Sequence, residues 1–365
     1  MKQIPGGVTA PKGFRAWGVH CGVKSKKADK KDLALILSDQ ECAAAAVYTM
    51  NRVKAAPLYV TMEHLEDGTA WGVAANSGNA NACCPMSHEY AEEMARLAAR
   101  ATGRAPADFV VASTGVIGQT LNIAAIRAGM PAAAAGLTAG PEGSDAAARA
   151  IMTTDTVKKE LALACSIGGR TVTLGAIAKG SGMIHPNMGT MLCFVTTDCA
   201  ITREMLSEAL REVVPRTFNR VTVDGDTSTN DMCAVLANGM AGNPLIEWKD
   251  DGYTVFLKAL RQLCQELARA IAGDGEGASR LITCAVREAR SEESAERLAK
   301  AVVGSPLVKA AMFGADANWG RVLCAMGYSK APFRPEYVDI SFSSAVGAVA
   351  VCRGGMGLDF DEEAA

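Results

Sequence analysis

Short apolar runs separated by polar or glycine-rich breaks dominate the first third of the chain, and their lengths are typical of β-strands. They predict four strands, at residues 14–23, 33–38, 44–50 and 70–75. The spacing of apolar residues then becomes helical, which predicts a helix over residues 87–102 with Ser87 as its N-cap and Glu89 in its first turn. This part of the chain is therefore expected to contain several strands followed by one helix.

The central third predicts buried strands, helices and a hairpin. Residues 109–113 are typical of a short buried strand, and two alanine-rich stretches after them favour helices. A hairpin is expected from residues 161–167 and 171–178, because the turn between them, 168–170, contains two glycines. Residues 191–195 are apolar on both faces, which predicts a strand buried on both sides.

The second half also mixes helices and strands. Helices are expected at residues 203–218, 255–272 and 294–312, and strands at 280–286 and between 337 and 352. A run rich in hydrogen-bond acceptors, 224–231, predicts an N-cap for a further helix that begins at Met232. Because strands occur in clusters with helices between the clusters, the pattern favours a mixed α/β fold, with mixed sheets covered by helices, over a regular βαβ winding.

Composition limits the classes of function. With 365 residues, of which 49% are apolar and 21% charged, the chain can form one large α/β unit or two closely packed halves. The formal net charge of −2 and the aromatic content of 5% argue against a nucleic-acid partner. No segment resembles a signal peptide or is long and apolar enough to span a membrane, so no membrane association is expected.

The chain contains twelve cysteines, and their placement predicts free thiols. Most of them lie within apolar runs, where cysteine packs as a small hydrophobic residue, and no Cys-x-x-Cys pair occurs. Disulfides form mainly in oxidising compartments, so the pattern predicts a reduced, cytoplasmic protein. The four histidines do not have the spacing of a ligand set, so no metal site is predicted.

The most informative chemistry lies in a turn with three glycines that begins at Lys179, ends at Thr190 and leads directly into the buried strand at 191–195. The Thr190 hydroxyl is suited to attack the carbonyl carbon of Gly189, convert the peptide bond to an ester and let water cut the chain. Thr190 would then be an N-terminal residue whose own amine serves as the base for its hydroxyl. A Gly-Thr pair before an apolar strand also occurs in ordinary turns, so this feature is weak by itself.

Further places combine polar groups with glycine. Thr114-Gly115 follows a buried strand, where a hydroxyl and an unobstructed backbone N–H can both point at developing negative charge. The others are the run 153–156, Glu276 between two glycines, and the acceptor-rich run 224–231, which suits either a metal or a helix cap. The run 76–81 suits either a bound ligand or a polar turn. Each has an ordinary structural interpretation when it is taken alone.

The combination is more specific than its parts. In chain order it comprises Thr114-Gly115, the run 153–156, the turn that ends at Thr190, Gly275-Glu276-Gly277 and the run 315–321. With these motifs the chain resembles the ornithine acetyltransferase family of arginine biosynthesis, also called glutamate N-acetyltransferase, from about Pro11 to Phe360. The resemblance implies an αββα layered sandwich, similar to that of N-terminal-nucleophile enzymes but with distinct connectivity. It also implies that no cofactor is needed and that the processed parts assemble as an α2β2 heterotetramer.

The resemblance further implies acetyl transfer through Thr190. Cleavage between Gly189 and Thr190 would give an α part, residues 1–189, and a β part, residues 190–365. Thr190 would then take the acetyl group of N-acetylornithine, release ornithine and pass the acetyl group to glutamate in a ping-pong cycle. Some members also use acetyl-coenzyme A (acetyl-CoA), and the sequence leaves open whether this chain does, as it leaves feedback by arginine open.

Site residues carry over from the family's motifs. The oxyanion hole corresponds to Thr114 and Gly115, and the substrate-contacting positions correspond to Thr156, Lys179, Thr190 and Glu276. The chain departs from the family in two respects. Gly189 stands where alanine is commoner, and a C-terminal segment of the family, with an asparagine and a threonine that contact substrate, is expected to be missing after Ala365.

Two alternative functions stay open at this point. The nearer one is a self-processing aminopeptidase-type hydrolase of similar architecture. The other is an uncleaved, inactive paralogue that only binds amino acids.

Overall fold

The computed structural model describes residues 1–23, 30–185 and 191–365, so the expected cleavage site, Gly189 and Thr190, lies outside the described residues. The chain forms two compact units. The larger contains residues 1–221 and 226–276, and the smaller contains residues 222–225 and 277–365. This division concerns packing, whereas the expected α and β parts concern a covalent cut, which stays a prediction.

The larger unit contains nine strands and six helices within the described residues. The strands are β1 (Lys2–Ile4), β2 (Phe14–Val19), β3 (Leu33–Tyr48), β4 (Thr69–Asn76), β5 (Phe109–Ser113), β6 (Lys159–Ile167), β7 (Arg170–Lys179), β8 (Leu192–Thr197) and β9 (Met232–Ala237). The helices are α1 (Ala56–His64), α2 (Ser87–Thr102), α3 (Ile123–Ala135), α4 (Pro141–Ala150), α5 (Arg203–Val213) and α6 (Asp251–Gly273). The smaller unit contains α7 (Glu292–Gly304), α8 (Pro306–Phe313), α9 (Trp319–Gly327), β10 (Ile340–Ser344), β11 (Gly347–Arg353) and β12 (Met356–Gly357).

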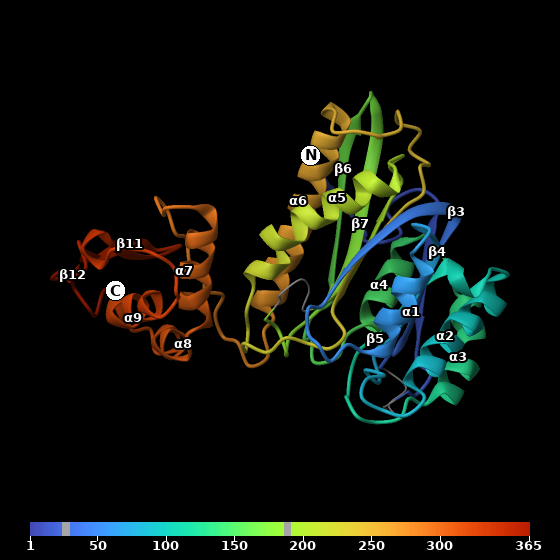
Figure 1. Cartoon of the computed structure of the whole chain (residues 1–365), viewed down its shortest axis with the longest axis horizontal. Coiled ribbons are helices and arrows are strands. Elements are labelled where there is room, and N and C mark those ends of the chain that lie inside the picture. The colour runs from blue at the N-terminus through green and yellow to red at the C-terminus, as the bar shows by residue number, and fades with distance from the viewer. Residues whose placement is uncertain (24–29, 186–190) are drawn as a thin grey trace. The chain divides into compact units, whose positions relative to one another are not determined.

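Strand β3 connects the two layers of the larger unit (Figure 1). Its first half pairs with β2 and β4, and its second half pairs with β9 from Ala43↔Ala237 to Tyr48↔Met232. The register against β4 shifts between Leu37 and Cys42, where the strand leaves one layer for the other. Within the described residues the strand order is β1-β6-β7-β8-β9-β3-β4-β5, with β2 beside β3.

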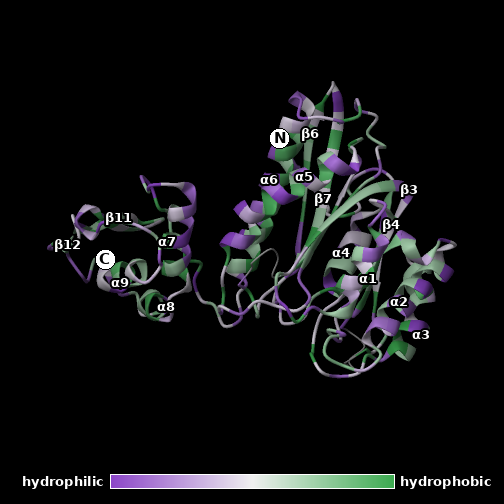
Figure 2. Cartoon of the chain, in the orientation of Figure 1, coloured by the Kyte–Doolittle hydropathy of each residue, from purple (hydrophilic) through white to green (hydrophobic). Residues whose placement is uncertain are grey.

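Alternating side chains on these strands face two different cores. Ala34 and Ile36 point into the core between the layers, where Phe194 of β8 and Leu236 of β9 meet them from the opposite layer. Their neighbour Leu35 points outward and packs with residues of α2 and α3. Helix α2 has hydrophobic residues on the side that faces the sheet and hydrophilic residues on the other, and both kinds are visible in Figure 2.

Helices also cover the outer face of the second layer. Helix α5 packs on β3, and α6 packs on β6 and β7. Cys264 of α6 contacts Cys233 of β9, whose neighbours Met232 and Ala234 face the inner core. The larger unit is therefore helix, sheet, sheet and helix in sequence, which confirms the mixed α/β fold with an αββα layered sandwich.

Several predicted elements are confirmed. The hairpin is β6 and β7, joined at Gly168 and Gly169, and the strand at 109–113 is β5. Helix α2 has the predicted bounds, but Ser87 is its first helical residue and Met86 takes the cap position without a side-chain cap. The two strands expected at 33–38 and 44–50 are one continuous strand, β3.

Other predicted elements are wrong. Met232 begins the strand β9 rather than a helix, because its apolar residues are buried on both faces and lie parallel to β8. Residues 280–286 form no strand. The helix expected at 294–312 is divided into α7 and α8 at Ser305, because Pro306 lacks the N–H that would continue the first helix. None of the described helices has both the length and the apolar character that crossing a membrane requires.

Candidate active site

A small pocket in the larger unit collects residues from four separate segments. They lie after β5, at the end of β7 and the turn behind it, at the start of β8, and immediately before β9. The lining residues are Thr114, Lys179, Gly182, Met183, Ile184, Met191, Leu192, Ser228, Asn230 and Asp231. Because β8 and β9 are parallel neighbours, with Leu192 paired to Met232, the residues that precede both strands meet at one edge of the sheet.

Thr114 and Gly115 form the end of the pocket that follows β5. The backbone N–H of Thr114 donates to the carbonyl of Asn76 at 2.9 Å. Gly115 has a φ of +132°, and a Cβ at this position would lie 2.8 Å from the backbone nitrogen of Asn79. Only glycine fits such a conformation and such a close approach, so any side chain at position 115 would displace the backbone after Thr114.

The asparagine-rich run 76–81 supports this geometry. The side-chain carbonyl of Asn76 accepts from the backbone N–H groups of Gly78 and Asn79, at 3.1 Å each, and its amide donates to the Ser113 hydroxyl at 2.6 Å. The Asn230 amide donates to the carbonyls of Ala80 and Ser113, at 2.6 and 2.8 Å. Neutral hydrogen bonds therefore fix Thr114 from both sides of the strand end.

Lys179 is the last residue of β7, is 7% exposed and lines the same pocket. Burial lowers the pKa of Lys179, while the nearby carboxyl groups of Asp155 and Asp231 act in the opposite direction. Burial also tends to raise the pKa of Asp155, but Lys179 and Lys159 outweigh it and keep that pKa below its ordinary value. Lys179 is thus a buried lysine with two acidic neighbours.

Asp231 also lines the pocket, whereas the sequence predicted only that its run, 224–231, suits either a metal or a helix cap. Its side chain lines the pocket and is 2% exposed, and burial raises its pKa well above the ordinary value. The hydroxyls of Ser228 and Thr49, Lys179 and the backbone N–H of Met191 oppose that shift. Within the described part of the chain, its Oδ2 atom has no hydrogen-bond partner. Asp231 directly precedes an apolar run, and this position in the sequence is typical of a residue at the end of a strand. That position was the one sign in the sequence that Asp231 lies at the end of the sheet.

Glu276 lies beside the pocket. Its backbone N–H donates to the Ser181 carbonyl at 3.0 Å. Its carboxylate lies against Gly182, which lines the pocket, and a Cβ on Gly182 would overlap that carboxylate. The turn after β7 therefore brings an exposed acidic group close to the buried Lys179.

Thr156 is placed differently from the other predicted residues. It is exposed and does not line the pocket, and its hydroxyl donates to the Asp274 carboxylate. Its backbone N–H donates to the same carboxylate at 3.1 Å. The structure thus brings Thr114, Lys179 and Glu276 together directly, and connects Thr156 to them through Asp274.

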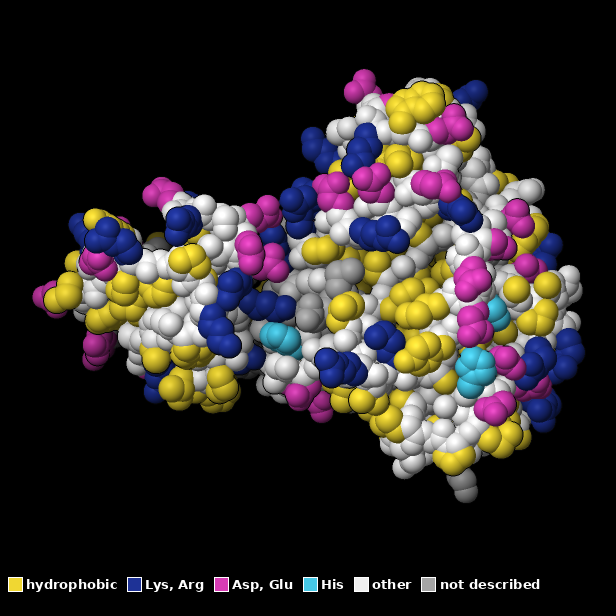
Figure 3. All heavy atoms as spheres, viewed as in Figure 1, with side chains coloured by type: hydrophobic (Ala, Val, Ile, Leu, Met, Phe, Trp, Pro, Cys, Tyr) yellow, Lys and Arg dark blue, Asp and Glu magenta, His cyan; other side chains and the backbone are white. Residues whose placement is uncertain are grey.

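Gly189 and Thr190 fall outside the described residues, but their position in the chain is informative. Met191 and Leu192, which follow Thr190 directly, both line the pocket. On the face that Figure 3 shows, acidic and basic side chains are interspersed over the larger unit.

Comparison with known proteins decides the family. The model of the ArgJ family matches residues 15–365. The chain belongs to the ArgJ family. The arginine biosynthesis bifunctional protein ArgJ of Symbiobacterium thermophilum is 54% identical over 366 residues, which cover 100% of this chain and 90% of that protein. ArgJ 1 of Clostridium acetobutylicum is 48% identical and covers 96% of this chain and 86% of its own length.

A solved ArgJ chain from Bacillus halodurans is 42% identical, with a TM-score of 0.49 over 51% of this chain and 97% of its own. Membership of the ArgJ family confirms the resemblance to the ornithine acetyltransferases. The chain is accordingly an acyltransferase of arginine biosynthesis.

Proposed function

We propose that this chain transfers the acetyl group of N-acetylornithine to glutamate through an acetyl ester on Thr190. One observation carries the proposal: Met191 and Leu192 line the pocket that also holds Thr114 and Lys179. Thr190 directly precedes Met191 in the chain, and the proposal assigns its reaction to this pocket. Membership of the ArgJ family supports the same chemistry.

The first step is self-cleavage. The Thr190 hydroxyl oxygen bonds to the carbonyl carbon of Gly189, and the amide C–N bond breaks as the nitrogen takes a proton. Water then hydrolyses the ester, which leaves a carboxylate on Gly189 and a free amine and hydroxyl on Thr190. The products are an α part, residues 1–189, and a β part, residues 190–365.

The second step is acetyl transfer. The Thr190 amine, with an ordinary pKa of about 7.7–8.0, takes the hydroxyl proton as the oxygen attacks the acetyl carbonyl carbon. The resulting oxyanion accepts hydrogen bonds from the Thr114 hydroxyl and the Gly115 N–H, and ornithine leaves with the proton. The amine of glutamate then attacks the acetyl ester, and N-acetylglutamate leaves as the Thr190 hydroxyl is restored.

Charged groups select the substrates. The buried ammonium of Lys179 attracts a substrate carboxylate, because few waters compete with it there. The carboxylate of Glu276 attracts the ammonium of ornithine. The Thr156 hydroxyl donates a hydrogen bond to Asp274, and its oxygen can still accept a hydrogen bond from a substrate N–H.

The same site also supports a second acetyl donor. The relatives from Symbiobacterium and Clostridium are named bifunctional proteins, and we include acetyl-CoA as a co-substrate that acetylates Thr190 for transfer to glutamate. The proposal further includes assembly of the processed parts as an α2β2 heterotetramer. The chain's twelve cysteines are free thiols, which suits a reducing cytoplasm.

The test is incubation of the purified chain with N-acetylornithine, with and without glutamate. We expect that ornithine release beyond one equivalent per enzyme requires glutamate, and that the mass spectrum contains a fragment beginning at Thr190. Continued release beyond that equivalent without glutamate would identify a hydrolase instead. A full-length chain that never yields the fragment would indicate an uncleaved binding protein, and Thr190→Ala, which should neither cleave nor transfer, is the control.

A further inference from the structure

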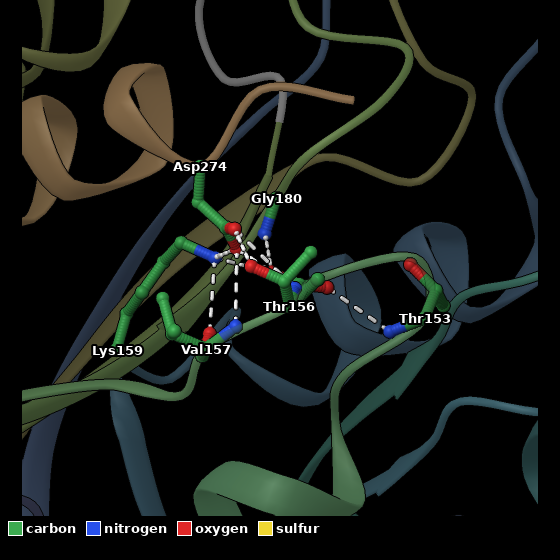
Figure 4. A network of polar contacts seen from close by, with 7 residues as sticks. Thr153, Thr156, Val157, Lys159, Gly180 and Asp274 are labelled. Carbon is green, nitrogen blue, oxygen red and sulfur yellow. Dashed lines mark hydrogen bonds and ion pairs between the residues drawn. The ribbon is translucent and has the colours of Figure 1, made fainter. Parts of the chain in front are cut away.

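A buried charge cluster lies behind the substrate-binding segments (Figure 4). The ammonium of Lys159, the first residue of β6, is 2.7 Å from Oδ1 of Asp155 and 2.6 Å from Oδ2 of Asp274. The side chains of Lys159, Asp155 and Asp274 are 1%, 0% and 7% exposed. Asp155 lies four residues before Lys159 and Asp274 lies after α6, so one lysine joins two parts of the sequence that are far apart.

Each carboxylate accepts a hydrogen bond from the backbone of a segment that carries a predicted substrate-binding residue. Asp155 accepts from the N–H of Gly180 at 2.7 Å and from the N–H of Thr153 at 3.0 Å. Asp274 accepts from the N–H of Thr156 at 3.1 Å and from the Thr156 hydroxyl. Gly180 directly follows Lys179, so Lys159 indirectly connects the two segments that carry Lys179 and Thr156.

Global stability is a poor explanation for such a cluster. Removing charges from water costs about as much as their attraction returns, and well-packed apolar residues often replace buried ion pairs without loss. An apolar side chain, however, has no oxygen atoms that could accept hydrogen bonds in the directions that Asp155 and Asp274 provide. The hydrogen bonds to Gly180 and Thr156 depend on those directions.

We propose that Lys159 is a positioning residue for substrate binding, which acts through Asp155 and Asp274 to fix the Lys179–Gly180 segment at the pocket and to hold the Thr156 segment in place relative to it. The proposal rests on the proposed function for the identity of the substrate. It does not place Lys159 in contact with the reacting atoms.

The charges that face this cluster come from several elements. Lys179 acts on Asp155 from β7, and Asp231 acts on Lys179 from the segment before β9. Lys30 contributes through its hydrogen bond to the Thr153 carbonyl, at 3.2 Å. Burial tends to raise the pKa of Asp274, and the hydrogen bonds from Lys159 and Thr156 hold it below its ordinary value. Removing Lys159 therefore raises the pKa of both carboxyl groups.

The direct test replaces Lys159 with methionine, which keeps the length of the side chain without its charge. In Lys159→Met we expect KM for N-acetylornithine to rise about tenfold, with a smaller change in kcat, because the binding segments lose their alignment. The ratio of variant to wild-type KM should grow as pH rises from about 4 to about 7, because the two unpaired carboxylates then ionise and repel each other.

Matched variants separate this role from packing. Lys158→Met is the control, because Lys158 is the next residue and pairs with Asp145 and Glu160 outside the cluster. It should leave KM and its pH dependence unchanged. The double variant with Lys159→Met and Asp274→Asn removes one of the unpaired carboxylates and should recover part of the lost affinity. Equal KM in wild type and Lys159→Met, or strictly additive effects in the double variant, would overturn the proposal.

A second readout does not depend on catalysis. Amide hydrogen exchange at Gly180 and Thr156 should be about tenfold faster in Lys159→Met than in wild type, and unchanged in Lys158→Met. Unchanged exchange at both amides contradicts the positioning role even if acetyl transfer is absent. If Lys159→Met does not fold, Asp274→Asn alone should speed exchange at Thr156, and the absence of that change would also overturn the proposal. Failure of wild type to transfer acetyl would instead refute the proposed function.

Discussion

On the β5 side of the pocket Thr114 is held by neutral amide groups, whereas on the β7 side Lys179 lies among buried charges. The β5 side consists of Thr114, Gly115 and the run 76–81, and its hydrogen bonds are between uncharged partners. The β7 side combines Lys179 with Asp155 and the cluster around Lys159. The two sides face the same small space but respond to different perturbations.

Under the proposed function, the difference corresponds to two chemical tasks. Stabilising an oxyanion requires donors whose positions are set before the charge develops, and neutral hydrogen bonds provide this without attracting protons or salt. Binding a zwitterionic amino acid requires full charges, and burial strengthens their attraction because less water screens them. The β5 side should therefore be sensitive to geometry, and the β7 side to charge and pH.

The largest expected effect is on the β5 side. Thr114→Val keeps the shape of the side chain but removes the hydroxyl donor, so kcat should fall by about 100- to 1,000-fold with little change in KM. The fall in kcat can be measured from the steady-state rate of ornithine release. Thr102→Val, which changes a hydroxyl in α2 that bonds to Ala98, should leave kcat unchanged. If Thr114→Val has the kcat of wild type, the Thr114 hydroxyl does not stabilise the oxyanion.

The next effect belongs to the β7 side. Lys179→Met leaves the buried Asp155 without one of its two lysine neighbours, and loss of one partner of a buried charge pair costs about 2–5 kcal/mol. We expect kcat/KM to fall by about 30-fold or more, mainly through KM. If kcat falls while KM is unchanged, Lys179 acts in the chemical step and the proposed division between the two sides is wrong.

A third effect tests whether the β5 side depends on geometry alone. Gly115→Ala forces a side chain into a φ of +132° and against the backbone of Asn79. The unfolding free energy should fall by about 1–3 kcal/mol, as denaturant titration would show. Gly118→Ala is a suitable comparison, because Gly118 also has a positive φ but nothing lies near its added Cβ. Equal losses in both variants would show that the contact with Asn79 is unimportant.

The smallest effect concerns pH. Burial raises the pKa of Asp231 in the folded chain, so the folded state holds this proton after the unfolded state has lost it. The contribution of Asp231 to stability therefore falls as pH rises above about 4, the ordinary value of a carboxyl group. Asp231→Asn removes that term, so the unfolding free energy of the variant should decline less with rising pH than that of wild type. If the unfolding free energies of wild type and Asp231→Asn change in parallel with pH, the pKa of Asp231 is not raised in the folded chain.

Much of the fold follows from local patterns in the sequence. The β6–β7 hairpin and β5 were predicted because their apolar runs end at turn residues. Strand β9 was missed, because the acceptors before Met232 are as typical of a helix cap as of a strand end, and only its place beside β8 makes it a strand. The division of α7 from α8 was missed although Pro306 marks it.

The candidate site was predicted in part and for identifiable reasons. Motifs identified Thr114, Lys179 and Glu276, which the structure brings to one pocket or its edge. Asp231 and the partners of Lys159 were not singled out, because an acidic residue in a polar run gives no local sign of burial. Their role depends on which strands are neighbours, and that information is long-range.

The most direct test of the acetyl-threonine account is the mass of the fragment that begins at Thr190 after incubation with N-acetylornithine alone. We predict a fragment heavier by one acetyl group, with the modification on Thr190, and a return to the unmodified mass when glutamate is added. An acetyl group on another residue would contradict the account. So would a cleaved chain that transfers acetyl to glutamate without any acetylated fragment.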